Sequence, residues 1–172
     1  INFNKLAKKF NKIKFDRVIF FNGYQKFSIL TLFNNKLFNK IIKINCTIPL
    51  KFWSFLFKSD LLKKNSATIF VSSIASELNE VGNAYYSLAK TLLNRSIRIL
   101  NEEQKKKHRF NVISLGIVKN KMSKNMIHNF PGKFKNKNSF IDINKMINGF
   151  KKIILSDTIK NSIINIHGNY KK

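Results

Sequence analysis

The stretch that decides the fold is residues 67–90, ATIFVSSIASELNEVGNAYYSLAK. Its first five residues are apolar or β-branched, which predicts a buried strand that stops at Ser72-Ser73. A polar turn follows at 77–83. Apolar residues then recur every three or four positions from about 84 to 106, which predicts a helix. A buried strand followed by a turn and an amphipathic helix is the repeating unit of a parallel sheet.

The same alternation continues on both sides of this unit. Short apolar runs predict further strands, and helical periodicity predicts further helices with a kink at Pro49. The expected strands are 17–21, 110–114 and 162–166, and the expected helices are 1–15, 33–58 and 141–155. The strands are apolar throughout, which is typical of a sheet covered on both faces. The sequence therefore predicts an α/β protein with a doubly wound parallel sheet, in a single domain over residues 1–172.

The composition excludes several other classes of protein. With 44% hydrophobic residues the chain is too apolar to be disordered, although its net charge is +25. No run approaches the ~18 uninterrupted apolar residues of a membrane span, so we expect a soluble, cytoplasmic protein with no membrane partner. Cys46 is the only cysteine, and the three histidines are far apart in the sequence. Neither a disulfide nor a metal site is therefore expected.

The charge does not by itself indicate a nucleic-acid partner. Lysines are spread from Lys5 to Lys172 and accompany many Asn, Ile and Phe residues, a bias typical of an adenine- and thymine-rich genome. Only four of the 33 basic residues are Arg, the residue that contacts bases through paired hydrogen bonds. Nucleic acid is therefore not expected as a partner. The alternative, a basic protein associated with nucleic acid, would bind RNA tightly with a steep dependence on salt.

Tyr86 and Lys90 form the most informative pair in the sequence. Residues four apart lie on one helical face, where an ammonium can stabilise a phenolate. Lowering the pKa of a phenol from about 10 to near 7 takes roughly 4 kcal/mol, which a nearby cation in a partly dry cleft can supply. Ser73, 13 residues earlier at a strand end, is expected to face the pair. Ser72 is the alternative for the serine role, although it points to the other side of the strand.

Three more residues stand at fixed intervals around this pair. Asn45 lies 28 residues before Ser73, Gly23 lies 22 before Asn45, and Gly116 lies 30 after Tyr86. Gly23 and Gly116 follow expected strand ends, where parallel sheets place their chemistry. This ordered set resembles the short-chain dehydrogenase/reductase family, and the resemblance extends over nearly the whole chain. It implies a Rossmann-like fold.

The resemblance also implies a role for each matching residue. Tyr86 would be the general acid or base at a carbonyl or hydroxyl oxygen, and Ser73 would hydrogen-bond that oxygen. Lys90 would lower the pKa of the phenol and bind the nicotinamide ribose. Asn45 would hold a water that relays protons to Lys90. Tyr85 is less suited to the tyrosine role, because the residue four positions later is Ala89.

The activity implied is hydride transfer between a nicotinamide cofactor, NAD or NADP, and a small-molecule carbonyl or alcohol substrate. Tyr86, Lys90, and backbone groups at Gly23, Gly116 and Val118 would contact the cofactor. The family also implies a homo-oligomer formed through helices 33–58 and 84–106. The Lys- and Asn-rich segment 119–138 is expected to be a mobile loop over the substrate.

The chain departs from the family pattern in three places. Phe20-Phe21-Asn22-Gly23 stands where the family has Asn-Asn-Ala-Gly, and Leu115-Gly116 stands where it has Pro-Gly. No glycine-rich phosphate turn precedes Gly23, the first glycine, so two βαβ units of about sixty residues have no counterpart here. The alternative function is therefore a truncated, non-catalytic remnant or binding module that is unable to hold the dinucleotide.

Overall fold

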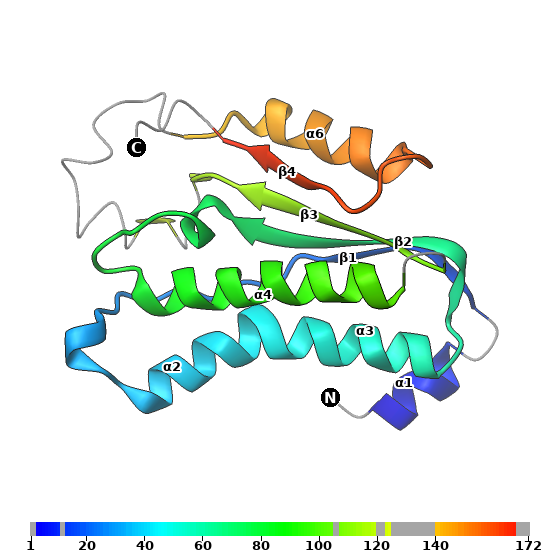
Figure 1. Ribbon diagram of the computed structural model, residues 1–172, viewed down its shortest axis with the longest axis horizontal. Helices are drawn as coiled ribbons and strands as arrows, with labels where there is room; N and C mark the ends of the chain where they lie inside the picture. Colours follow the sequence, from blue (N-terminus) through cyan, green and yellow to red (C-terminus); the bar gives the residue numbers. More distant parts are fainter. Residues whose placement is uncertain (1–2, 11–12, 105–106, 120–122, 125–139, 168–172) are drawn as a thin grey trace.

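The sheet of this protein is parallel throughout (Figure 1). The computed structural model describes residues 3–10, 13–104, 107–119, 123–124 and 140–167. Four strands follow one another in the sheet in the order β1-β2-β3-β4. They are β1 (Phe15–Phe20), β2 (Leu62–Ser73), β3 (Arg109–Leu115) and β4 (Ile163–Ile166). The predicted α/β class with a parallel sheet is confirmed.

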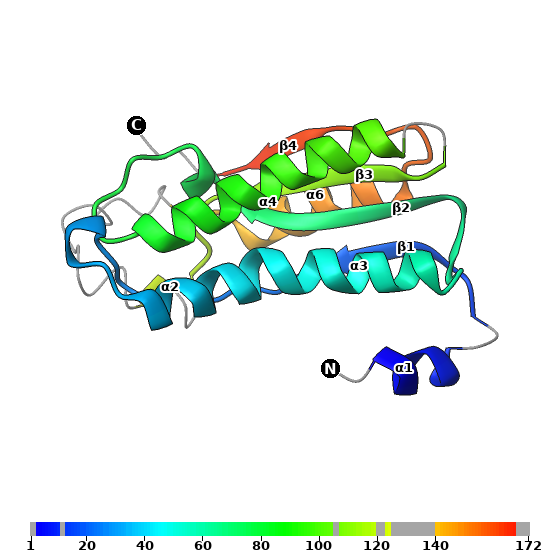
Figure 2. The ribbon, with the colours of Figure 1, turned by 60° about the horizontal axis from the view of Figure 1, so that its bottom comes forward.

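Helices connect the strands and cover both faces of the sheet. They are α1 (Phe3–Lys9), α2 (Asn35–Ile42), α3 (Ile48–Lys58), α4 (Ala84–Glu103) and α6 (Ile143–Leu155). α3 and α4 lie on one face and α6 lies on the other, as Figure 2 shows. None of the helices within the described ranges is long and apolar enough to cross a membrane.

The alternation of side chains along the strands produces two apolar cores. On the face of α3 and α4, Phe70 and Val112 pack with Trp53 and Leu93. On the face of α6, the neighbouring strand residues pack with that helix; they are Ile69, Val71 and Ile113. Because successive strand residues point to opposite faces, strands that are buried on both sides must be apolar throughout. This is why the strand predictions from apolar runs succeeded.

The last connection differs in hand from the first two. Each connection moves one strand along the sheet in the same direction, but α3 and α4 lie on one face and α6 on the other (Figure 2). The β3–α6–β4 crossover therefore has the opposite hand to the two that precede it. Parallel crossovers are right-handed in about 98% of cases, so the sequence order alone does not predict this arrangement.

The expected helix at 33–58 is divided in the structure. A π-helical segment, η2 (Lys43–Thr47), separates α2 from α3. The irregularity therefore precedes Pro49, which sits in the first turn of α3, where a missing N–H is tolerated. The interruption expected at Pro49 is thus present as a π-helical segment that ends two residues before it. The expected helix 1–15 is also shorter, since α1 ends at Lys9.

Two other predictions can be compared with the structure only in part. The expected strand at 67–71 belongs to a longer strand, β2, which begins at Leu62. Between Leu62 and Ala67 the pairing with β1 is irregular, and apolar patterning does not reveal such a bulge. The expected substrate loop at 119–138 lies almost entirely outside the described residues.

Candidate active site

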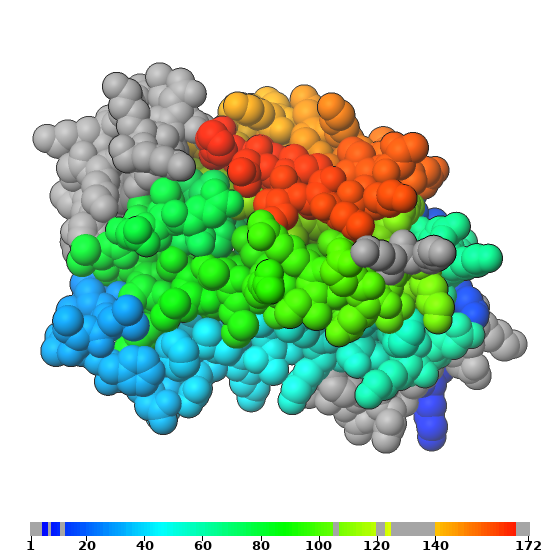
Figure 3. Space-filling model, in the orientation of Figure 1, coloured from blue at the N-terminus to red at the C-terminus, as the bar shows by residue number. Residues whose placement is uncertain are grey.

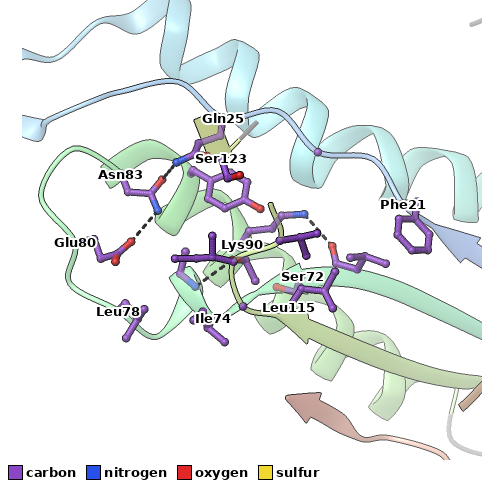
Figure 4. A pocket seen from close by; sticks show the side chains of 18 of the residues that line it. Phe21, Gln25, Ser72, Ile74, Leu78, Glu80, Asn83, Lys90, Leu115 and Ser123 are labelled. Atoms are coloured by element: carbon purple, nitrogen blue, oxygen red, sulfur yellow. Dashed lines mark hydrogen bonds between the residues drawn. The ribbon is translucent and has the colours of Figure 1, made fainter. Parts of the chain in front are cut away.

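A cavity of about 280 Å³ opens at the carboxyl ends of β1, β2 and β3. The segments that line it come from the strand ends, the start of α4 and one turn of α6, and Figure 4 shows their side chains. Ser73, Tyr86 and Lys90 all line this cavity, as do Gly23, Gly116 and Val118. The structure thus brings together six of the seven predicted site residues; Asn45 is not among the lining residues.

Ser73 and Tyr86 face each other across the cavity from two elements. Ser73 ends β2 and caps the short 3-10 helix Ile74–Ser76, since its Oγ accepts a hydrogen bond from the Ala75 N–H at 3.2 Å. Tyr86 stands in the first turn of α4. The Ser73 hydroxyl is near enough to the Tyr86 phenol to lower its pKa through hydrogen bonding. This pairing places two hydroxyl groups where one substrate oxygen can contact both.

Lys90 is buried below Tyr86, with 2% of its surface exposed. Its Nζ donates a hydrogen bond to the Val71 carbonyl at 2.9 Å and lies 5.7 Å from the centre of the Tyr86 ring (Figure 4). Burial lowers the pKa of Lys90 to about 8, partly offset by nearby Cys46. An ammonium has three N–H groups, and in the described part of the chain only one has a partner. The remaining two favour a ligand with hydroxyl acceptors.

The acidic phenol expected from the sequence is not found in the chain by itself. Burial raises the pKa of Tyr86 to about 12, and the hydrogen bond with Ser73 offsets this only in part. The ammonium of Lys90 lies beside the face of the ring, where it makes a cation–π contact. The spacing of four residues correctly placed the two groups together, but it carries no information about the cost of burying the phenolate.

Asn45 supports the cavity from behind. It lies in η2 and is fully buried, and its amide spans the backbone of Tyr24: Oδ1 accepts from Tyr24 N at 3.2 Å, and Nδ2 donates to Tyr24 O at 2.7 Å. Nδ2 also donates to the Ile41 carbonyl at 2.9 Å. Both N–H groups of the amide therefore bind backbone carbonyls, and the expected role of Asn45 in holding a relay water stays a prediction.

The main chain of Asn45 lies four residues before Pro49. In an α-helix its carbonyl would accept from the N–H four residues later, but that residue is Pro49, which has no N–H. The π-helical register of η2 accommodates this mismatch. Asn22 also donates its side-chain amide to the Ile44 carbonyl, so η2 holds residues 22–24 in place. The irregular segment thus fixes one wall of the cavity.

The alternatives considered from the sequence occupy other environments. Tyr85 is buried, and its Oη accepts a hydrogen bond from Asn34 N at 2.6 Å, so it fixes the start of α2. Ser72 is buried at the cavity wall, and its Oγ has no partner among the described residues. His108 Nδ1 shares a hydrogen bond with Ser66 Oγ at 2.9 Å. Burial and the charge of Lys107 lower the pKa of His108, which favours the neutral ring.

The sequence did not single out the polar wall of the cavity. Gln25 Nε2 donates to Asn83 Oδ1 at 2.9 Å, and Asn83 Nδ2 donates to Glu80 Oε2 at 3.3 Å (Figure 4). The available signal was the polar turn 77–83, which follows the end of β2. The opposite wall is apolar, with Ile74, Leu78 and other aliphatic side chains.

The comparisons with known proteins decide the family. A family model described as enoyl-(acyl carrier protein) reductase matches residues 2–147. This chain belongs to the short-chain dehydrogenase/reductase family. No curated protein matches its sequence. The resemblance inferred from the spacing of Asn45, Ser73, Tyr86 and Lys90 is thereby confirmed.

Solved structures of the short-chain dehydrogenase/reductase family share the fold. An oxidoreductase of this family from Burkholderia thailandensis superposes with a TM-score of 0.82 at 17% identity, over 98% of this chain and 69% of that one. A 4-hydroxyisoleucine dehydrogenase complexed with NADH and succinate superposes with a TM-score of 0.77 at 16% identity, over 98% of this chain and 74% of that one. An angucycline C-6 ketoreductase with bound NADP superposes with a TM-score of 0.76 at 11% identity, over 95% of this chain and 66% of that one. The chain thus has the Rossmann-like fold of proteins that bind nicotinamide dinucleotides.

Proposed function

We propose that this short-chain dehydrogenase/reductase is an NAD(P)-dependent oxidoreductase that interconverts a carbonyl compound and its alcohol. The observation that supports this most strongly is the meeting of Ser73, Tyr86 and Lys90 in one cavity at the carboxyl ends of the strands. In open α/β sheets this edge is where ligands bind.

The residues of the cavity fit the nicotinamide end of such a cofactor. Lys90 offers two buried N–H groups with no partner in the described chain, which suit the two hydroxyls of a ribose. Backbone groups at Gly23, Gly116 and Val118 line the same cavity. The bound cofactor supplies the hydride. A volume of about 280 Å³ suits a nicotinamide-sized group rather than a whole dinucleotide.

In this proposal the chain's own residues handle the proton. The Ser73 and Tyr86 hydroxyls hold the substrate oxygen between them, and Tyr86 gives its proton to that oxygen as the carbonyl is reduced. Lys90 stabilises the phenolate that remains, since its ammonium lies beside the ring. Because the pKa of Tyr86 is about 12, its proton is fully present at neutral pH, which favours the direction of reduction.

The second candidate is a non-catalytic remnant or binding module. The printed sequence has no glycine before Gly23, so it contains no glycine-rich turn for the cofactor phosphates ahead of β1. Such a module would keep the sheet and the cavity but would not retain a dinucleotide.

Cofactor binding separates the two candidates. NADH and NADPH are titrated separately into the chain, and the change in nicotinamide fluorescence is recorded. The oxidoreductase proposal predicts saturable binding that weakens at least about tenfold in Lys90→Met, because the ribose loses its charged donor. The exposed Lys51→Met variant is the control. An absence of saturable binding by either cofactor would support the remnant instead.

We also propose that the chain forms a homo-oligomer through α4 and the stretch from α2 to α3. These helices lie side by side and make one broad surface, which faces the viewer in the lower half of Figure 3. Leu88, Leu92 and Ile99 of α4 are between 44% and 48% exposed and recur at helical spacing. An exposed apolar stripe of this kind is typical of a protein interface.

A further inference from the structure

A second hollow lies at the opposite end of the sheet, where the strands begin. Its volume is about 760 Å³, and it is formed by the starts of β1, β2 and β3 and by the segment that follows α6. In Figure 1 the arrowheads of the strands point away from this end. Ser66 lines the hollow and Ser73 lines the active site, seven residues further along β2. At the rise of a strand this separation is roughly 20 Å, so the two sites are distinct.

The hollow concentrates positive charge. Five of its eleven lining residues are Lys or Arg, against 33 of 172 in the whole chain. They are Arg17, Lys63, Lys64, Arg109 and Lys160, and they face two acids, Asp16 and Asp157. Two of the four arginines of the chain therefore meet here, although the lysines are spread over the sequence. The excess of cations favours an anionic ligand.

The two guanidinium groups are held in place by the protein. Arg17 donates from Nε to the Ile154 carbonyl at 2.9 Å, from Nη1 to the Asp16 carbonyl, and from Nη2 to Asp157. Arg109 donates to the Asn65 carbonyl at 3.1 Å, the Ser156 carbonyl at 2.9 Å and Asp157 at 3.3 Å. Each guanidinium has five N–H groups, so two on each have no partner in the described chain. Fixed donors of this kind bind oxyanions at little cost in side-chain entropy.

A bulge in β2 brings two lysines to the same place. One residue of β1, Asp16, stands opposite the four residues Lys63–Ser66, because Phe15 pairs with Leu62 and Arg17 pairs with Ala67. Within the bulge Asn65 adopts a positive φ of 62°, and its N–H donates to the Lys107 carbonyl at 2.9 Å. Bulges re-aim side chains and are common next to functional sites. Lys63 and Lys64 are exposed and make no ion pair with any described residue.

We propose that this hollow binds a small molecule that carries at least two phosphate groups. The two guanidinium groups and the ammonium groups of Lys63, Lys64 and Lys160 offer more positive charge than one phosphate neutralises, and adjacent phosphates can divide these donors among them. The volume lies within the range of small-molecule sites. A concave site with anchored arginines favours a compact ligand over a long nucleic acid, which would track charge over the whole surface.

The test compares two triple variants of equal net charge. In Lys63→Gln/Lys64→Gln/Lys160→Gln the hollow loses three cations. The control variant, Lys36→Gln/Lys43→Gln/Lys51→Gln, loses three cations from exposed positions between α2 and α3 instead. Inorganic pyrophosphate is titrated into each protein by calorimetry at constant ionic strength, with inorganic phosphate as the second probe. Circular dichroism checks that each variant is folded.

The proposal predicts that pyrophosphate binds the parent chain more tightly than phosphate does. The hollow variant should bind pyrophosphate at least about tenfold more weakly, while the control triple variant changes less than about twofold. Equal weakening in both variants would show binding to the general charge and would overturn the proposal. Loss of binding in Lys90→Met would also overturn it, because the ligand would then occupy the active site. Binding of a single-stranded RNA oligonucleotide but not of pyrophosphate would identify a different class of ligand.

Discussion

The Lys90 side chain is buried in surroundings that disfavour its positive charge. Its pKa falls from 10.5 to about 8 because the ammonium is buried, so at neutral pH the folded chain carries the cost of a desolvated cation. Between about pH 8 and 10.5 the unfolded chain binds this proton and the folded chain does not. Stability therefore rises with pH across this interval, where the cost of the charge is relieved.

We predict that Lys90→Met is more stable than the parent chain at pH 7, by up to about 3 kcal/mol, since a buried apolar side chain replaces a buried ammonium. The rise in stability between pH 8 and 10 should also disappear. Urea unfolding at several pH values measures both effects. Lys51→Met, at an exposed position, should change stability by less than about 0.5 kcal/mol. A variant that is destabilised at pH 7 would show that the ammonium stabilises the fold.

Asn45 is a positioning residue, since its amide binds the backbone of Tyr24 and not the cavity. We predict that Asn45→Ala destabilises the chain by about 2–3 kcal/mol, because buried backbone groups lose their partners. Asn39→Ala, which removes one exposed hydrogen bond with Asn35, should cost much less in the same urea unfolding experiment. Equal costs for the two variants would contradict the bracing role.

The site could be predicted from the sequence only where spacing fixes geometry. A separation of four residues in a helix places Tyr86 and Lys90 on one face, and the strand end positions Ser73. Spacing does not reveal burial, so the raised pKa of Tyr86 was not foreseen. It also does not show what a side chain binds, so the engagement of the Asn45 amide with Tyr24 was missed.

At the scale of elements, glycines mark two close contacts between segments. A Cβ on Gly116, at the end of β3, would come within 2.8 Å of the His167 Cβ and 3.0 Å of its Cα. A Cβ on Gly149 in α6 would meet the end of the Ile166 side chain. Backbone cannot move aside as easily as the tip of a side chain. An added Cβ is therefore tolerated less well at Gly116 than at Gly149.

We therefore predict that Gly116→Ala destabilises the chain by about 1–3 kcal/mol, because β3 and the end of β4 must move apart. Gly149→Ala should cost less, since the contact is relieved by a rotamer change and alanine favours the helix by about 1 kcal/mol over glycine. Thermal unfolding of the two variants, scanned under one set of conditions, measures the difference. The reverse order would contradict the contacts described.

Elements with a regular period were predicted and irregular ones were not. Apolar runs located all four strands, because burial on both faces removes polar residues from them. The π-helical segment η2 and the bulge at Lys63–Ser66 have no period of their own. Both depend on hydrogen bonds to distant segments, such as the contact of Asn65 with Lys107.

For the whole molecule, the exposed stripe on α4 leads to a prediction about assembly. We expect the parent chain to elute from a size-exclusion column as an oligomer at micromolar concentration. Leu88→Lys/Leu92→Lys should elute as a monomer, because a buried interface does not tolerate unpaired charges. The matched control is Ile143→Lys/Ile147→Lys on the exposed side of α6. A monomeric parent chain would contradict the proposed interface.

The central claim is that the Tyr86 hydroxyl transfers the proton in a nicotinamide-dependent reaction. The most direct measurement follows the oxidation of NADH and NADPH at 340 nm with a panel of aldehydes and ketones, for the parent chain, Tyr86→Phe and Tyr85→Phe. We predict carbonyl-dependent oxidation by the parent chain, a loss of about 100-fold or more in Tyr86→Phe, and retained activity in folded Tyr85→Phe. Equal rates for the parent chain and Tyr86→Phe, or no carbonyl-dependent oxidation by the parent chain, would contradict the claim.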